Sequence, residues 1–265
     1  MSDRRKAQSA IKRLHALSGG DEMVRKAAAR LLATLDPTEA TELLHELIAM
    51  TRMGHEHARC VLPAFTRALE MEGSTIPYAA EFLRVAALME HKDVADLLVT
   101  GAPLREYDLD AARRADAKLF TQSLGYLKQK ARSTTNADEL ARLSVASDPS
   151  VVRNVLVNPR TTEALVVRIA ARRPARPEPL EEIWKSPRWS VNAAVRRALV
   201  FNPYLPPAVG SKIVPLLAAI ELQEVLDDGG VHPLLREQAA RLLGLPRPRR
   251  AMPLPLQEEE RRERS

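Results

Sequence analysis

Residues 152–160 read VRNVLVNPR and residues 196–204 read RRALVFNPY, so an arginine, an apolar triplet and an Asn-Pro pair recur forty-four positions apart. The same offset pairs Ile169 with Ile213 and carries Arg197 on to Arg241. A fixed period of this size is typical of stacked helical repeats, because one unit cannot bury its apolar face without a neighbour. The recurrence therefore predicts a repeat architecture over this part of the chain.

The Asn-Pro pairs, Asn158-Pro159 and Asn202-Pro203, have a mechanical interpretation. Proline disfavours the helical conformation in the residue before it, so the preceding helix should end at the asparagine. The short amide of asparagine tolerates a turn and bonds free backbone groups. The next helix is expected to begin with a threonine cap in the first copy and with a proline in the second, at Thr161 or Thr162 and at Pro206 or Pro207.

The composition of the 265 residues favours an all-α fold. Hydrophobic residues make up 45% and charged residues 28%, but aromatic residues only 4%. Alanine, leucine, arginine and glutamate dominate, and the β-branched and aromatic runs that strands prefer are missing. This length suits one elongated repeat domain or two compact ones.

Apolar spacing divides the chain into four parts. Residues 1–104 show three- and four-residue periodicity and predict amphipathic helical hairpins. Residues 105–118 lose this period, carry dense mixed charge and are expected to form a connector. Helical repeats are predicted over 119–245, and the proline- and charge-rich residues 246–265 are expected to be a disordered tail, with a short polyproline ligand as the alternative.

One stretch resembles a known repeat. DELARLSVASDPSVVRNVLVNPRTT, residues 138–162, is similar to the leucine-rich-repeat-variant motif, a HEAT-like helical unit with spaced leucines, an Asp-Pro turn, a Val-Arg step and an Asn-Pro followed by threonine. PEPLEEIWKSPRWSVNAAVRRALVFNP, residues 177–203, looks like a second copy, with a turn about four residues longer and no Asp-Pro. The resemblance covers roughly residues 136–245, and the earlier helices suggest only generic HEAT-like pairs.

The resemblance implies a right-handed α-solenoid that binds partners on its surface, and it implies no chemistry. The family also includes a protein with an amino-terminal iron–sulfur cluster held by a group of cysteines. Cys60 is the only cysteine here, so that cluster is not expected in this chain, and neither is a disulfide.

The formal charge of +6 is concentrated in one segment. Residues 151–200 contain ten Lys and Arg against four Asp and Glu, a surplus equal to that of the whole chain. A concentrated surplus on a repeat is what a polyanion-binding face needs. Alternatively, the arginine stems cover the seams between helices.

Arg153, Arg197 and Arg241 share the repeat offset and should project from equivalent positions of successive units. They could form a ladder that grips phosphates or carboxylates. Alternatively, each arginine pairs with a nearby acid or caps helix carbonyl groups between layers.

A second group of residues combines arginine with tryptophan, the types most enriched at interface hot spots. It suits a protein partner, or a nucleic-acid backbone with stacked bases. The alternative is a solvated arginine face above tryptophans buried between helices. Under the contact hypothesis, changing Arg172 and Arg173 together to glutamate would weaken partner binding. The group consists of Arg160, Arg168, Arg172, Arg173, Arg176, Arg188 and Trp189, with Trp184 nearby.

Ligand-type residues also gather in GHEHARC, where His55, His57 and Cys60 follow His45 and Glu46 upstream. On a helix only His57 and Cys60 share a face, and zinc sites usually need four convergent ligands. Ordinary surface histidines and a buried thiol are therefore expected, with no metal or other cofactor.

Motifs of catalysis are missing from the sequence. There is no phosphate-binding G-x-x-x-x-G-K, no G-x-S-x-G and no H-E-x-x-H, and the pairs Asp227-Asp228 and Glu181-Glu182 fit solvated helix surfaces. With no signal-peptide core and no apolar run of membrane length, we expect a soluble, cytoplasmic protein.

Three functions remain open at this point. A non-enzymatic protein-binding scaffold or adaptor with no small-molecule substrate is favoured. Sequence-independent nucleic-acid binding by residues 151–200 is the alternative, and a HEAT-like DNA glycosylase is a distant third. The arrangement of the arginines should discriminate between them, since unpaired arginines on one face would favour nucleic acid and paired ones the scaffold.

Overall fold

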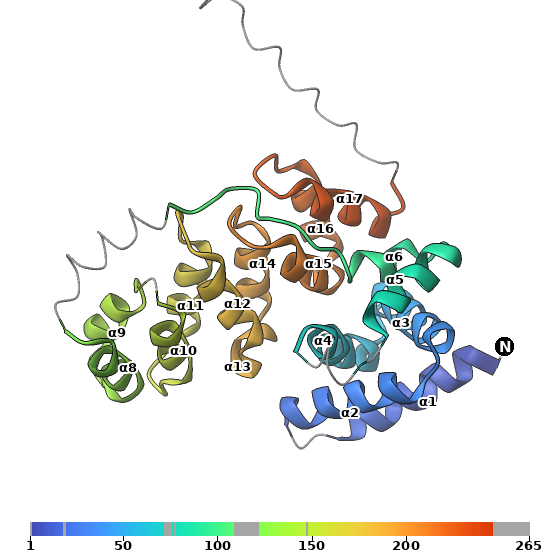
Figure 1. Cartoon of the computed structure of the whole chain (residues 1–265), viewed down its shortest axis with the longest axis horizontal. Coiled ribbons are helices and arrows are strands. Elements are labelled where there is room, and N and C mark those ends of the chain that lie inside the picture. The colour runs from blue at the N-terminus through green and yellow to red at the C-terminus, as the bar shows by residue number, and fades with distance from the viewer. Residues whose placement is uncertain are drawn as a thin grey trace, which may run out of the picture.

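The chain folds into helices and connecting segments throughout the part that the structure describes. This computed structural model describes residues 2–17, 20–71, 76, 78–108, 122–146 and 148–245. Those residues contain no strand, which confirms the all-α prediction (Figure 1). None of the helices formed by these residues has the length and apolar character needed to cross a membrane.

The N-terminal helices gather around α3, which packs against α1, α4, α5 and α6. Pro37 lies in the first turn of α3, where no backbone N–H is needed for a hydrogen bond within the helix. The Asp36 carboxylate caps this helix by accepting hydrogen bonds from two backbone N–H groups. Leu44 and Leu47 of this helix are buried, as is Phe65 of α4. The helices are α1 (Ser2–Ala16), α2 (Asp21–Thr34), α3 (Pro37–Arg52), α4 (Glu56–Met71), α5 (Ala79–Leu88) and α6 (Lys92–Asp96).

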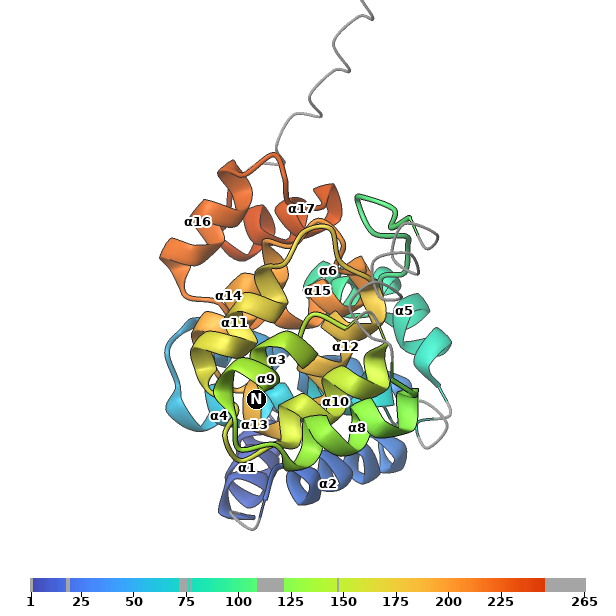
Figure 2. The same ribbon diagram turned by 90° about the vertical axis from the view of Figure 1, so that its left-hand side faces the viewer.

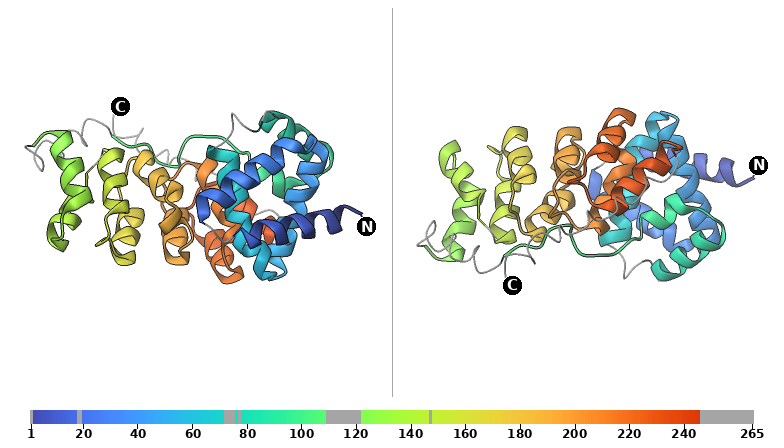
Figure 3. Two further views of the ribbon diagram at one scale, coloured as in Figure 1. Left: turned by 90° about the horizontal axis from the view of Figure 1, so that it is seen from below. Right: turned by 90° about the horizontal axis from the view of Figure 1, so that it is seen from above.

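The C-terminal helices are shorter and lie in successive rows that run side by side, as Figure 3 shows. Neighbouring rows pack directly, with α8 on α10, α10 on α12 and α11 on α14. The helices are α8 (Leu124–Ser133), α9 (Ala137–Leu143), α10 (Pro149–Val157), α11 (Glu163–Ala171), α12 (Pro177–Lys185), α13 (Pro187–Ser190), α14 (Ala193–Val200), α15 (Pro207–Ile213), α16 (Ala219–Asp227) and α17 (Pro233–Leu242), with the 3₁₀ turn η1 (Val214–Leu216).

Proline and asparagine set the helix boundaries in these rows. Several helices begin with a proline, which suits a position where no backbone N–H is needed. Helix α10 ends at Val157, directly before Asn158, and Thr162 caps α11 by accepting a hydrogen bond from the backbone N–H of Leu165. After the second corner, α15 begins at Pro207. The first corner and both helix starts are therefore confirmed, whereas α14 (Ala193–Val200) already ends two residues before Asn202, with Phe201 between them.

The connector predicted at 105–118 falls partly outside the described residues, which stop at 108 and resume at 122. Its described part lies against the C-terminal helices. The backbone N–H of Arg105 donates to Pro203 O at 3.1 Å, and the Tyr107 ring meets the edge of Tyr204 with centroids 6.4 Å apart. The start of the connector is thus packed against the second Asn-Pro corner. The predicted tail at 246–265 lies outside the described residues.

The N-terminal and C-terminal helices pack on each other, chiefly through α4 and α3 on one side and α15 and η1 on the other. Helix α6 also packs on α17 (Figure 2). Polar side chains bridge them as well. Trp184 Nε1 donates to Glu70 Oε2 at 2.9 Å, Arg67 Nη1 donates to Ser190 Oγ at 2.9 Å, and Arg52 Nη1 donates to Leu217 O at 3.1 Å. The spacing of apolar residues within either half does not predict this contact between the two halves.

Gly210 of α15 leaves no room for a side chain, because a Cβ there would overlap one Leu235 methyl group and lie 3.1 Å from the other. We expect Gly210→Ala to destabilise the protein by about 2 kcal/mol through overpacking between α15 and α17. Gly125→Ala in α8 is the matched control, since a Cβ there meets nothing within 4 Å. That substitution should stabilise by about 0.5 kcal/mol. The free energy of unfolding of each variant can be measured with urea. If both substitutions lowered it, or both raised it, the packing argument would be wrong.

Candidate functional site

The three repeat arginines each bind an acidic side chain of another helix. Arg153 forms a two-bond contact with Glu182 of α12 at 2.6 and 2.7 Å. Arg197 contacts Glu224 of α16 through the same two donor atoms, but Nε and Nη2 both donate to one oxygen, Oε2, at 3.0 and 2.7 Å. Each contact joins a helix to the second α-helix after it and pairs two opposite charges.

Arg241 departs from this pattern and binds backward to the N-terminal half. Its Nε lies 2.9 Å from Asp96 Oδ2 at the end of α6, and its Nη2 contacts the other carboxylate oxygen. Burial raises the pKa of Asp96 to about 6, although Arg241 acts in the opposite direction. The third arginine of the predicted ladder therefore joins the two halves of the chain.

The asparagines of both corners are buried and donate to helix ends of the preceding row. Asn158 is 1% exposed, and its Nδ2 donates to the backbone oxygens of Ala131 and Thr134 at 2.9 and 3.0 Å. Asn202 is 2% exposed and donates in the same way to Ala170 and Arg172, at 2.7 and 2.9 Å. These amides satisfy carbonyl groups that a helix end leaves free. The prolines differ in their surroundings, since Pro159 is exposed and Pro203 is buried.

Three of the predicted contact arginines bind backbone carbonyl groups of neighbouring rows. Arg172 donates to Val145 O, and Arg173 donates to Phe201 O. Arg188 donates to the backbone oxygens of Asn158 and Thr161 at 3.1 and 3.0 Å. Charge reversal of Arg172 and Arg173 would therefore remove contacts within the fold, and loss of binding in that variant would have two causes.

The remaining predicted arginines divide into one paired and two exposed residues. Arg176 pairs with Glu178 of α12 at 2.9 Å. Arg160 and Arg168 are exposed, and neither side chain forms a hydrogen bond or ion pair with another described residue. The concentrated positive charge of residues 151–200 is thus largely distributed over contacts between rows.

Both tryptophans are buried in the core. Trp189 donates from Nε1 to Leu156 O at 2.9 Å, and the Arg188 guanidinium lies 4.3 Å from its ring centroid. Trp184 is fully buried on α12. Neither indole is available to an external partner, so the predicted contact surface consists of its arginines alone.

A hollow of about 700 Å³, with polar and apolar surface in about equal parts, lies where the α3–α4 turn meets the end of α13, α14 and η1. Sequence reasoning did not bring these residues together, because they come from three separate stretches of the chain. Its lining contains two arginines, one acid and two apolar side chains among small residues: Thr51, Gly54, Glu56, Arg59, Cys60, Pro63, Val191, Arg196 and Leu216.

The hollow contains polar groups without partners. Thr51 Oγ1 and Arg196 Nε are buried and form no hydrogen bond with any described residue, and the same holds for Nε of Arg52, next to Thr51. The pKa of Arg196 is lowered, chiefly because the guanidinium is buried. The negative charge of Glu221 opposes this effect, and the like charge of Arg59 adds to it. No ion pair of Arg59 or Arg196 forms with any residue that the structure describes. Such groups suit an incoming acceptor, because an unsatisfied buried donor is unfavourable.

Apolar side chains are exposed beside this hollow. Met53, directly before the lining residue Gly54, is 58% exposed, and Val191, which lines the hollow, is 53% exposed. Ile220 is 70% exposed and precedes Glu221, the acid whose charge acts on Arg196. Arginine together with exposed apolar groups is typical of a protein contact site.

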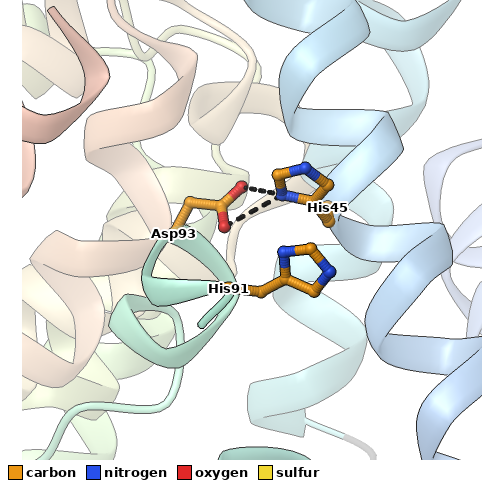
Figure 4. Close-up of side chains that lie close together, drawn as sticks. All are labelled: His45, His91 and Asp93. Carbon is orange, nitrogen blue, oxygen red and sulfur yellow. Dashed lines mark hydrogen bonds and ion pairs between the residues drawn. The ribbon is translucent and has the colours of Figure 1, made fainter. Parts of the chain in front are cut away.

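A second cluster joins His45, for which no role was expected, to two residues that the sequence analysis did not single out, His91 and Asp93 (Figure 4). Asp93 Oδ2 and Oδ1 lie 2.9 and 3.1 Å from His45 Nδ1, and the two imidazole rings stack with centroids 4.0 Å apart. The hydrogen bond with Asp93 raises the pKa of His45 against the opposing effect of burial. The only sequence signal was the run His91-Lys92-Asp93 itself, which has no ligand-type spacing to His45.

The residues of GHEHARC behave differently from the prediction in one respect. Cys60 is exposed, so the expectation of a buried thiol is wrong. Ala58 and Val61 in the same turns are buried, whereas Cys60 shares the exposed face of α4 with His57 and lies at the edge of the hollow. His55 and His57 are exposed, as expected for surface histidines, and the rings of His57 and His15 are tilted by 33° with centroids 4.1 Å apart.

Comparison of this chain with family models, with curated proteins and with solved structures found no match.

Proposed function

We propose that the chain is a non-enzymatic protein-binding scaffold built as a right-handed α-solenoid of HEAT-like, leucine-rich-repeat-variant units. Two recurring contacts between rows support this architecture: the Arg–Glu pairs of Arg153 and Arg197, and the buried amides of Asn158 and Asn202. Contacts that recur at a constant offset between neighbouring rows are what a stacked repeat requires.

The hollow beside α4 is the surface that we assign to the partner. The observation that carries this proposal is Arg196, whose buried Nε has no partner and which lies near Arg59 and the exposed apolar side chains Met53 and Val191. An acidic peptide segment with an adjacent apolar residue supplies acceptors for the arginines and covers the apolar groups. Nucleic acid is less favoured, because most arginines of residues 151–200 bind acids or carbonyl groups within the fold.

Selection of peptides from a random display library against the purified chain tests this function. We expect enriched sequences to combine Asp or Glu with a large apolar residue. Arg59→Glu should weaken their binding by at least about tenfold, since charge reversal at a contact arginine costs more than about 1.4 kcal/mol. Arg168→Glu is the matched control, an exposed arginine of the predicted contact surface that lies away from the hollow, and it should leave the affinity unchanged.

Two results would contradict the proposal. Peptides that bind Arg59→Glu as well as they bind the unaltered chain would place the contact elsewhere. Failure to enrich any peptide, together with binding of a random DNA duplex or RNA strand that falls steeply with salt, would favour the nucleic-acid function. Binding is therefore measured at several salt concentrations. The affinity for nucleic acid falls steeply with salt because phosphate contacts release counterions, whereas the affinity of a mixed apolar and ionic contact depends less on salt.

A further inference from the structure

We propose that His45, His91 and Asp93 form a binding site for a divalent transition-metal ion of the zinc type. One ligand atom from each residue lies within 4.8 Å of the other two. In Figure 4 the Asp93 carboxylate and a nitrogen of each imidazole face the same small space between α3 and the start of α6. Helix α3 and the α6 region, far apart in sequence, therefore place three ligand-type side chains together.

The ligand set selects the class of ion. Two imidazoles and one carboxylate suit Zn²⁺, Co²⁺ and Ni²⁺, whereas Mg²⁺ and Ca²⁺ prefer sites made of oxygen atoms alone. Tetrahedral zinc with bonds of about 2.1 Å requires ligand atoms about 3.4 Å apart. His45 Nδ1 and Asp93 Oδ2 are separated by 2.9 Å, so this pair needs to open by only a few tenths of an ångström.

Ion binding replaces a proton at this site. His45 Nδ1 and Asp93 share a hydrogen bond, which holds a proton where the ion would lie. When a divalent ion binds, a protonated His45 loses that proton to solvent, and both His45 and Asp93 turn their lone pairs to the ion. Binding should therefore weaken as the pH falls.

Glu42 supports the His91 ring from the other side. Its Oε1 lies 3.6 Å from His91 Nε2, one helical turn before His45 on α3. A carboxylate on the second nitrogen of a ligating histidine orients the ring and raises its basicity. Both rings stack nearly parallel, at 21°, so the His91 ring must rotate to turn its lone pair to the ion. His91 and His45 remain partly exposed, at 19% and 36% of their side chains, which leaves room for this rotation.

Titration of the tag-free, chelator-treated full chain with Zn²⁺ by calorimetry tests the site. We expect one ion per chain with micromolar affinity, visible absorption bands of tetrahedral Co²⁺, and no binding of Mg²⁺. His91→Ala and Asp93→Asn should each weaken Zn²⁺ binding by more than about tenfold. Glu42→Gln should weaken it less, because Glu42 acts through His91.

Two control variants separate this cluster from the other ligand-type residues. His57→Ala removes a histidine whose ring contacts that of His15, and Cys60→Ser removes the exposed thiol. Both should keep the affinity of the unaltered chain, and circular dichroism should show the same helical content in all variants. The proposal is overturned if Asp93→Asn binds Zn²⁺ as tightly as the unaltered chain, if either control loses as much affinity as His91→Ala, or if no Zn²⁺ binds.

Discussion

Replacement of Trp184 by alanine is expected to lower the free energy of unfolding by about 4 kcal/mol, as for other large aromatic side chains removed from packed cores. Trp184 is fully buried on α12 and donates from Nε1 to Glu70 of α4 at 2.9 Å. The Arg67 guanidinium of α4 lies 6.0 Å from its ring centroid. Urea unfolding followed by circular dichroism measures the effect, and a loss below about 1 kcal/mol would mean that the ring is not packed as described.

Trp184→Phe separates the hydrogen bond from the packing of the ring. Burial raises the pKa of Glu70 above its ordinary 4.5, while Lys212, Lys185 and the Trp184 N–H act to lower it. Without the N–H the pKa of folded Glu70 rises further, so the folded state binds a proton more strongly than before. The stability lost in Trp184→Phe should therefore be smallest near pH 4.5 and grow as the pH rises through the pKa of folded Glu70.

Trp189→Phe is the matched control for this pH dependence. Trp189 is also buried and donates one hydrogen bond, but its acceptor is the backbone oxygen of Leu156, which does not titrate. The cost of Trp189→Phe should be about 1–2 kcal/mol at every pH. Equal pH profiles for the two phenylalanine variants would show that Glu70 is not the group that responds to Trp184.

Local features of this fold could be predicted from the sequence because neighbouring residues determine them. Helix starts at Pro37 and Pro207, the cap at Thr162 and the helix end before Asn158 depend on backbone preferences within a few positions. The all-α class follows from the same preferences summed over the chain.

Contacts between distant segments could not be predicted in this way. The repeat offset indicated that Arg153 and Arg197 occupy equivalent positions, but it did not identify Glu182 or Glu224 as their partners. Arg241 lies at the same offset and yet binds Asp96, because the N-terminal half packs there. Which acid binds each arginine depends on how neighbouring rows, and the two halves of the chain, pack on each other. A sequence pattern within one segment does not determine that packing.

The candidate sites show the same limit. The arginine and tryptophan residues of 151–200 stood out in the sequence as a contact surface, but the indoles are buried and three arginines bind backbone oxygens within the fold. The hollow and the histidine cluster each combine segments that are far apart in the chain. Their residues have no distinctive spacing in the sequence, and they come together only in the folded chain.

Asn202→Ala and Asn158→Ala are each expected to destabilise the protein by about 3 kcal/mol. Each substitution removes two donated hydrogen bonds and leaves two carbonyl groups of the preceding row without that partner in a buried place. Asn154→Ala is the control, since Asn154 donates only to Ser150 O within its own helix and is half-buried. Urea unfolding measures all three variants, and Asn154→Ala should change the free energy of unfolding by no more than about 0.5 kcal/mol.

Asn158→Asp distinguishes bonding between rows from bonding within the corner. The Asn158 side chain also accepts a hydrogen bond from the backbone N–H of Arg160 at 2.8 Å, which shapes the turn itself. Aspartate keeps that acceptor but has no N–H to offer Ala131 O and Thr134 O, and its charge would face those oxygens in a buried site. If the amide serves to join rows, Asn158→Asp must destabilise at least as much as Asn158→Ala. Near-native stability of Asn158→Asp would instead mean that asparagine recurs only to form the turn, and that apolar packing alone holds the rows together.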